Sequence, residues 1–341
     1  MILCKRGIGF LFILIILNIS SLFGQDAHFS QFYANPLYLN PAFAGSNNCP
    51  RFTLNFRDQW PALPGNFITF SGSYDQHISI LRSGIGVLVS ADKAGGGILN
   101  TYNASAIYNF RIRATHKFNL QFALQGGYLS SSVNWAKLSF ASDYFDPNLP
   151  DYTIIHEYNS KSQFDAAFGF MGYTSYLYFG MAIHHLFPVQ ISFLRNSNDK
   201  FKTKWEPKLT FHVGGKITIS QKMRNEINTG DIFLYPNLVF ISHGPFHYLH
   251  EGAYFNFYPF TFGAWLRHNF KNFDALIVSC GVEYKFLRIG YSYDFSLTKL
   301  ERTGGAHEVS LQFTIPCNNE NAESRSLKKR MQYSPVECPR F

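Results

Sequence analysis

A strict two-residue alternation near the C-terminus constrains the fold more than any other feature. In the stretch 305–316, GAHEVSLQFTIP, apolar and polar side chains take turns. The apolar set is Val309, Leu311, Phe313 and Ile315, and the polar set is Glu308, Ser310, Gln312 and Thr314. The preceding stretch RIGYSYDFS alternates in the same way. Because successive side chains of a β-strand point to opposite faces, the two stretches predict a hairpin with one apolar and one polar face.

Composition indicates which environment the apolar face meets. Aromatic residues make up 18% of the 341 residues and charged residues only 15%. After residue 24, no apolar stretch reaches the roughly 20 residues that a transmembrane helix requires. Many aromatic and few charged residues are typical of a β-barrel whose outer face contacts lipid. A soluble β-sandwich is the alternative, but it usually carries more surface charge. We therefore predict an all-β fold, a transmembrane antiparallel β-barrel of about 14 strands.

The lengths of the connections agree with this prediction. We expect the first strand at Arg51–Gln59 and the last at Ala306–Pro316. If the first strand rises from the periplasm, the two longest connections, Ser131–Ser162 and Leu186–Pro207, lie outside the cell. Most connections on the other side are short, as in outer-membrane barrels. An even number of strands also predicts that both termini are periplasmic.

Four segments follow from these patterns. Residues 1–24 are predicted to be a signal peptide, with Lys5 and Arg6 before an apolar run and cleavage after Gly24. Residues 25–50 form an irregular segment that we call the lead-in. Residues 51–316 form the barrel. The polar residues 317–341 are expected to be a periplasmic tail.

The lead-in carries two Asn-Pro steps and several aromatic residues. Proline disfavours both helix interiors and central strands, so we expect irregular structure. We predict that the lead-in folds into the barrel mouth as a plug. A mobile tail is the alternative, but tails rarely keep so many aromatic residues.

Two cysteines flank the predicted barrel. Cys49 precedes the first strand and Cys317 follows the last one. These strands pair when a barrel closes, so their free ends meet at one rim. We therefore expect a Cys49–Cys317 disulfide in the oxidising periplasm. Cys338 is a competing partner for either cysteine.

Charged residues on the polar strand faces are expected to point into the lumen, since a charge facing the lipid midplane costs about 2–4 kcal/mol. Arg288 and Asp294 lie on one predicted strand, and Glu308 lies on the next. We predict that these three brace the lumen through ion pairs. A polar path or a docking surface is the alternative role.

The turn Trp60–Gly65 is the best candidate for contact with a partner. Two prolines stiffen it, so little entropy is lost on binding, and tryptophan is a frequent anchor in interfaces. We select Trp60, Leu63 and Pro64 as binding candidates. The alternative is that Trp60 belongs to the aromatic belt at the membrane surface.

Other function classes find little support in the sequence. His247 and His250 fall on opposite faces of a strand, as do the adjacent His184 and His185, so neither pair is suited to hold a metal. One of the adjacent pair is expected in the lumen and the other at the membrane. Hydrolase motifs are lacking, and the net charge of +8 is spread along the chain. We predict no enzyme activity, no cofactor and no nucleic-acid partner.

Three long stretches of the chain have a recognisable sequence. They are QDAHFSQFYANPLYLNPAFAG from residue 25, NFRDQWPALPGNFITFSGSYDQHI from residue 55, and RIGYSYDFSLTKLERTGGAHEVSLQF from residue 288. In this order they resemble the PorP/SprF family of type IX secretion in Bacteroidota. The tail after residue 317 lies outside the resemblance. The resemblance implies a barrel in the outer membrane that works with the type IX machinery.

The resemblance also implies the partners. It suggests a non-enzymatic protein that binds and anchors or escorts a secreted surface adhesin, through the adhesin's C-terminal signal domain, with a role in gliding motility. Outer-membrane lipid and periplasmic type IX components are the other expected partners. The alternative is an outer-membrane channel for small or hydrophobic solutes.

Overall fold

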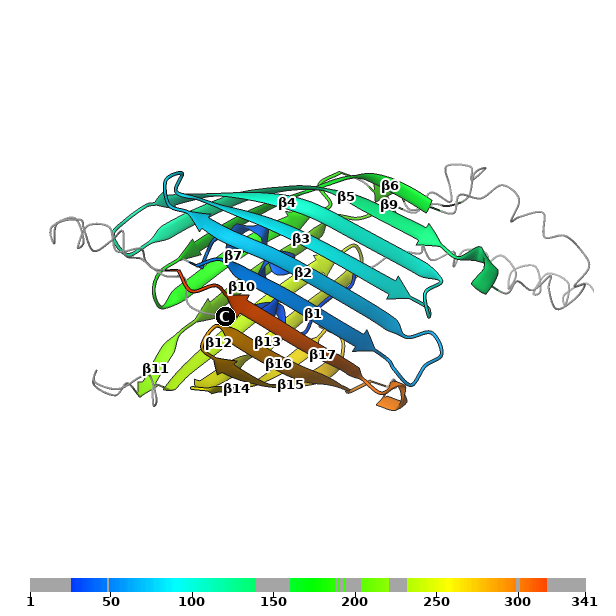
Figure 1. Cartoon of the computed structure of the whole chain (residues 1–341). Coiled ribbons are helices and arrows are strands. Elements are labelled where there is room, and N and C mark those ends of the chain that lie inside the picture. Colours follow the sequence, from blue (N-terminus) through cyan, green and yellow to red (C-terminus); the bar gives the residue numbers. More distant parts are fainter. Residues whose placement is uncertain are drawn as a thin grey trace, which may run out of the picture.

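The computed structural model describes residues 26–47, 49–138, 160–187, 189–190, 193, 204–220, 232–298 and 301–317. Within these residues, a tilted antiparallel sheet wraps around a central lumen (Figure 1). No helix in the described part of the chain is long and apolar enough to cross a membrane.

Fourteen strands build the barrel, if β10 and β11 are counted as one strand interrupted at Lys216. The strands are β1 (Arg51–Gln59), β2 (Phe67–Ile78), β3 (Ser83–Ala94), β4 (Leu99–Arg113), β5 (Asn119–Val133), β6 (Ser160–Tyr173), β7 (Leu177–His184), β10 (Lys208–Gly215), β11 (Ile217–Ser220), β12 (Ile232–His243), β13 (Phe246–Phe257), β14 (Phe260–His268), β15 (Phe273–Tyr284), β16 (Leu287–Ser296) and β17 (Ala306–Thr314). A separate two-residue pairing joins β8 (Val189–Gln190) to β9 (Lys204–Trp205).

Pairing of the first and last strands closes the barrel. β1 runs antiparallel to β17 from Arg51 opposite Thr314 to Gln59 opposite Ala306. On the far side, β10 pairs with both β7 and β12. This pairing removes the sheet edges that β1 and β17 would otherwise expose to lipid, as a membrane barrel requires. The predicted fold class is confirmed.

Burial alternates along the strands as the sequence predicts. On β1, Thr53 and Asn55 are buried, whereas Phe52 and Leu54 are exposed on the outer face. The same alternation makes Val309 of β17 an outward residue. An outer face rich in large apolar side chains is stable in lipid but would be unfavourable in water.

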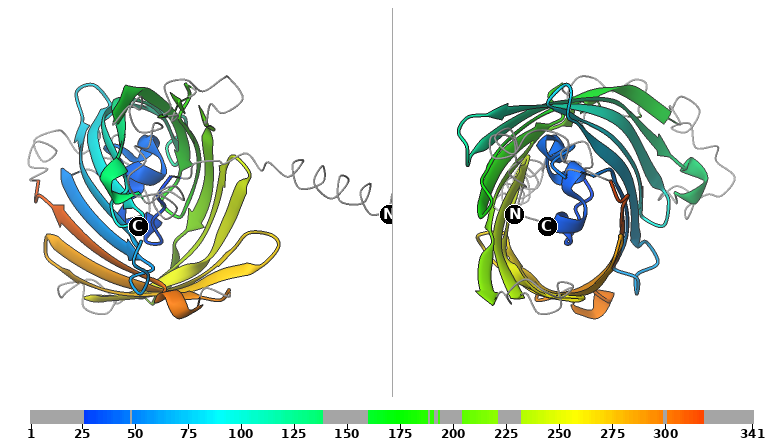
Figure 2. Two further views of the ribbon diagram at one scale, coloured as in Figure 1. Left: turned by 90° about the vertical axis from the view of Figure 1, so that its right-hand side faces the viewer. Right: turned by 60° about the vertical axis from the view of Figure 1, so that its left-hand side comes forward.

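The lead-in lies inside the lumen (Figure 2). It forms three short helical turns, η1 (Phe32–Ala34), α2 (Pro36–Leu39) and η2 (Pro41–Phe43). Prolines start α2 and η2, where a missing backbone N–H costs no helical hydrogen bond. Side chains of these turns are fully buried against the barrel wall, and they include Leu37, Ala42 and Phe43.

The two ends of the barrel differ. One end carries the turn at Trp60 and the connections after β3, β5 and β7, and we call it the loop end. At the opposite end, the disulfide end, Cys49 and Cys317 form a disulfide with their Cα atoms 5.5 Å apart. β5 and β6 extend further than expected, to Val133 and from Ser160, because their ladder continues to Ser132 opposite Ser160. Most of the connection between them, like Cys338, lies outside the described residues.

The disulfide provides the first prediction. It joins residues 268 positions apart, so its loss frees a large loop in the unfolded state. Replacing Cys49→Ser should lower the free energy of unfolding by about 3 kcal/mol, measured by urea titration in lipid vesicles. The control is Cys280→Ser, because Cys280 is a free, exposed cysteine. Equal stability of Cys49→Ser and the unchanged chain would contradict this expectation.

Candidate functional site

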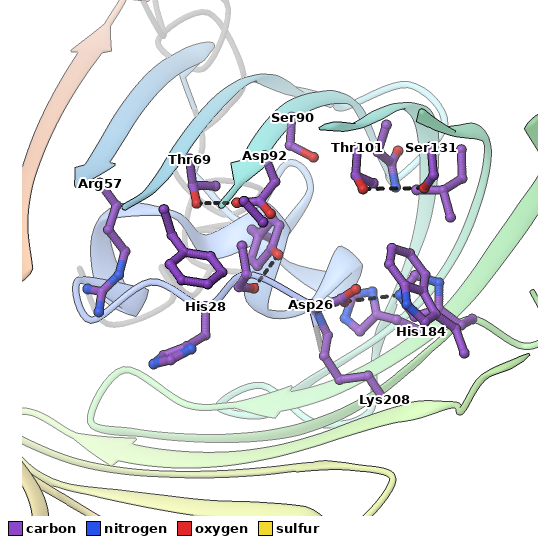
Figure 3. Close-up of a pocket in the computed structure, with 18 of the residues that line it drawn as sticks. Asp26, His28, Arg57, Thr69, Ser90, Asp92, Thr101, Ser131, His184 and Lys208 are labelled. Atoms are coloured by element: carbon purple, nitrogen blue, oxygen red, sulfur yellow. Dashed lines mark hydrogen bonds and ion pairs between the residues drawn. The ribbon is translucent and has the colours of Figure 1, made fainter. Parts of the chain in front are cut away.

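A cavity of about 540 Å³ lies at the loop end of the lumen (Figure 3). We call it the vestibule. The lead-in contributes Asp26 and His28 to its lining, and strands β2 to β6 contribute hydroxyl, amide and carboxyl side chains. Trp60, Phe67 and Trp205 add aromatic surface. The vestibule therefore combines a mixed polar wall with aromatic rings, a composition suited to binding a ligand.

Asp26 links the start of the described chain to the barrel. Its Oδ2 accepts a hydrogen bond from Lys208 Nζ at 2.7 Å and lies 3.0 Å from His185 Nε2. The other ring nitrogen of His185, Nδ1, lies 3.0 Å from Asp165 Oδ2. A protonated imidazole can donate to both carboxylates, so His185 bridges the lead-in and β6.

The charges around Asp26 shift two pKa values. Burial by itself would lower the pKa of His185, but the nearby carboxylates of Asp26 and Asp165 outweigh it and raise the pKa to about 9. Burial by itself would raise the pKa of Asp26, but Lys208 and His185 hold the pKa of that carboxyl well below its usual value. Near neutral pH this cluster is therefore charged and tightly paired.

A second charged cluster is built around Arg57, which also lines the vestibule. Arg57 NH2 contacts Asp294 at 2.9 Å, and Arg57 NH1 contacts Glu308 at 3.1 Å. Arg267 NH1 also contacts Asp294, at 3.1 Å. The side chains of Arg57, Asp294 and Glu308 are almost completely buried. Buried charges of this kind are stable only when each one has opposite charges and hydrogen-bond partners around it.

The lead-in supplies several of those partners. Glu308 accepts backbone N–H bonds from Ser30 at 2.8 Å and from Gln31 at 2.9 Å. The Ser30 hydroxyl donates to Asp294 at 2.6 Å and accepts from Arg57 at 2.8 Å. The charges of β1, β16 and β17 therefore hold the lead-in in one position as well as each other.

The lead-in is also fixed near the disulfide end. Asn109 Nδ2 donates to the carbonyl oxygens of Ala42 and Ala44, at 2.9 and 2.6 Å. Asp75 accepts from the backbone N–H of Gly45 at 2.9 Å. Gly84 lies so close that an added methyl group would overlap the Ala44 carbonyl. The described lead-in is thus anchored along its whole length.

The predicted bracing residues divide into two groups. Asp294 and Glu308 share Arg57, but Arg288 does not join them. It contacts Glu283 Oε2 through NH2 at 2.5 Å instead. The reason is distance along the strand, because six residues separate Arg288 from Asp294 and each residue advances a strand by about 3.3 Å. Arg57 of β1 takes the place expected of Arg288.

The binding candidates lie at the rim of the vestibule. Trp60 is half-buried, lines the vestibule and packs edge-on against Phe67. Its backbone N–H donates to the Gly305 carbonyl at 2.8 Å. Leu63 and Pro64 are exposed. The turn is therefore held against the β16–β17 connection while two of the three candidate side chains remain accessible.

The histidine pairs behave differently from each other. His247 is exposed and His250 is buried, as strand alternation predicts. His184 and His185, however, are both buried. His185 has a positive φ of 57°, so it follows the end of β7 rather than continuing the alternation. Within the described residues, no group of three or more His, Cys, Asp or Glu side chains is placed to hold a metal ion.

Sequence reasoning also missed Asp26, Asp165 and Lys208. The three residues are far apart in the chain, and only barrel closure brings them together around His185. An available signal was the lone acidic residue at the start of an otherwise uncharged lead-in, since residues 27–47 contain no Asp, Glu, Lys or Arg.

The Arg57 cluster supplies the second prediction. Replacing Arg57→Met leaves Asp294 and Glu308 buried with less positive charge beside them, a change that typically costs about 3–5 kcal/mol. We expect the lead-in to loosen, with faster hydrogen exchange at residues 29–34 and a measurable conductance in planar bilayers. Arg302→Met, at an exposed arginine of the loop end, is the control. Unchanged exchange in Arg57→Met would show that this cluster does not hold the lead-in.

The Asp26 cluster supplies a pH prediction. The pKa of His185 is raised, so its stabilising contribution is complete below about pH 6.5 and is lost as the pH rises through 9. The pKa of Asp26 is lowered, so its contribution is lost only in strong acid. After correction for intrinsic rates, residues 26–30 should exchange faster at pH 9.5 than at pH 6.5. In His185→Gln, this pH difference should shrink. A profile that is equally flat in both proteins would contradict the assignment.

The chain is similar to solved structures at low sequence identity. The toluene transporter TbuX of Ralstonia pickettii is 11% identical, with 86% of this chain and 96% of that chain covered and a TM-score of 0.47. A Pseudomonas aeruginosa FadL homologue is 12% identical, with 87% and 96% covered and a TM-score of 0.45. At these values the likeness carries no conclusion about function. A search among curated proteins found no match.

A family model matches residues 21–313, which span the lead-in and nearly all of the barrel. The matched family is described as type IX secretion system membrane protein PorP/SprF. The match covers the three stretches that resemble the family, so the predicted family membership is confirmed. The chain belongs to the PorP/SprF family of type IX secretion system membrane proteins and is an outer-membrane β-barrel.

Proposed function

We propose that this protein binds a secreted surface adhesin at the loop end of its barrel, and anchors or escorts it without catalysing a reaction. The observation that carries the proposal is the position of the lead-in, which occupies the lumen and is hydrogen-bonded to β17 through Glu308 and to β4 through Asn109. A partner can then use the barrel as a platform. Family membership supplies the link to type IX secretion.

Passage of a folded partner through the lumen would require the lead-in to leave. Its departure would strip Glu308 of the two backbone N–H groups of Ser30 and Gln31. It would also expose the apolar side chains of Leu37 and Phe43, which are fully buried. Both changes are unfavourable. This cost supports a role in holding a partner rather than conducting one.

The rim of the vestibule offers a preorganised surface. The backbone N–H of Trp60 donates a hydrogen bond to the Gly305 carbonyl, and the backbone N–H of Ala62 donates one to the Thr303 carbonyl at 3.2 Å. A turn held in this way loses little entropy when a partner docks. Leu63 and Pro64 are exposed apolar contacts beside the half-buried Trp60. We propose that these three residues contact the adhesin's C-terminal signal domain.

The opposite end suits a different partner. In this proposal the disulfide end faces the periplasm, where the Cys49–Cys317 bond forms and is retained. Periplasmic type IX components would meet the protein there. Adhesin held at the outer face would account for a role in gliding motility.

A channel for small or hydrophobic solutes is the second candidate. The vestibule, at about 540 Å³, is large enough for a small molecule. Its lining, however, includes Asp26 and His28 of the anchored lead-in. A steady conductance of the unchanged protein in planar bilayers would favour the channel.

Capture of the partner tests the proposal. A tagged barrel purified after surface cross-linking should bring down a large surface protein that carries a C-terminal secretion signal. The double change Trp60→Ala with Leu63→Asp should reduce this capture about tenfold, by removing the aromatic anchor and placing a charge in the apolar contact. Leu81→Asp, at an exposed leucine of the disulfide end, is the control.

Barrel levels are compared by heat-dependent gel mobility before capture is scored. If the intact protein captures no surface protein, and its deletion leaves surface attachment and motility unchanged, the proposed function is wrong. Equal capture by the double variant would reject the Trp60 turn as the contact.

A further inference from the structure

The polar groups of the vestibule are not balanced between donors and acceptors. Four neighbouring strands each place one carboxylate or amide side chain in its lining: Asp92 on β3, Asn103 on β4, Gln125 on β5 and Asp165 on β6. We call these four residues the acceptor wall. Figure 3 shows Asp92 on the same side of the cavity as Thr69 and Ser90, across from Asp26 and Lys208.

The cations that line the vestibule are already paired. Lys208 contacts Asp26 at 2.7 Å, and its Nζ lies 4.7 Å from the centre of the Tyr38 ring. Arg57 contacts Asp294 and Glu308. The Nε of Arg57 has no hydrogen-bond partner, but the two terminal nitrogens of its guanidinium already meet opposite charges. Little attraction for an anionic ligand therefore remains in this cavity.

The acceptor wall, in contrast, has capacity left. Asp165 and Gln125 are more than nine-tenths buried, yet Asp165 Oδ1 and Gln125 Oε1 have no hydrogen-bond partner. Asn103 Oδ1 is unpartnered as well. Asp92 accepts one bond, from the Thr69 hydroxyl at 2.6 Å, and meets no cation among the described residues. Buried acceptors without donors are costly, so they indicate a ligand that supplies donors.

We propose that the vestibule receives a lysine or arginine side chain from an extended segment of the secreted partner, with the acceptor wall holding its cationic group. This inference rests on the proposed function and names the chemistry of the partner at the same site. An ammonium or guanidinium group has only donors and a positive charge, which matches a wall of oxygen acceptors that includes an unpaired carboxylate.

The remaining lining suits the rest of such a segment. Trp60 and Phe67 stand at the rim, and Trp205 packs with Leu129 inside the cavity. Aromatic faces attract cations and cover aliphatic stems at the same time. The hydroxyls of Ser90, Thr101 and Ser131 can bond a peptide backbone. The vestibule would thus select a basic residue and tolerate variation in its neighbours.

The test uses the full-length barrel in detergent and three fluorescein-labelled pentapeptides. Each peptide has glycine and serine around a central residue, which is lysine, norleucine or glutamate. Fluorescence polarisation should show that the lysine peptide binds about tenfold more tightly than the norleucine peptide, and that the glutamate peptide binds most weakly. Equal binding of lysine and norleucine peptides, or a preference for glutamate, would overturn the inference.

Variants locate the effect on the acceptor wall. Asp92→Asn and, separately, Asn103→Leu should reduce the preference for lysine. Asp58→Asn is the matched control, because Asp58 also lies near the loop end and accepts a side-chain bond, from Asn66 at 2.9 Å, but does not line the vestibule. An unchanged lysine preference in both wall variants would also overturn the inference.

This titration needs no natural partner, so its outcome is separate from that of the capture experiment. Capture of an adhesin without a lysine preference would reject only the cationic side chain. A lysine preference without any captured surface protein would reject only the proposed function.

Discussion

The contact between the lead-in and the buried charges of the barrel wall is the interaction on which the rest of this structure depends. Arg57, Asp294 and Glu308 are removed from water, and each would be unstable alone. The backbone N–H groups of Ser30 and Gln31 donate hydrogen bonds to the Glu308 carboxylate. The lead-in is therefore required to satisfy the wall, and the wall is required to hold the lead-in.

This mutual dependence shapes the lumen. Because the lead-in is anchored at Asp26, at Ser30 and again at Gly45, it occupies the lumen and leaves the vestibule above it. A barrel filled in this way is suited to present a surface at its loop end. On one side of the vestibule, Asp26 and Lys208 form an ion pair. On the other side, oxygen atoms of the acceptor wall have no hydrogen-bond donor.

Much of the fold could be predicted from the sequence, but several side-chain contacts of the site could not. Alternation predicted β1 with the bounds that the structure shows, and it predicted that the first and last strands pair. The site was less accessible to this reasoning. Arg288 was grouped with Asp294 because both share a strand face, but shared direction does not imply proximity along a strand. His185 left the alternation because its backbone is left-handed at the end of β7.

By itself, the sequence determined the class of the molecule. Alternating strands predicted a barrel with an aromatic-rich outer face, and the prolines of the lead-in predicted irregular structure. Sequence similarity to the family extends over most of the chain. These features are local, since each depends on neighbouring residues and their period. Tertiary structure alone decided which charges meet. Arg57 reaches Asp294 across 237 positions and Ser30 reaches Glu308 across 278. The reason is that the closure of the barrel and the path of the lead-in place those side chains in one buried volume.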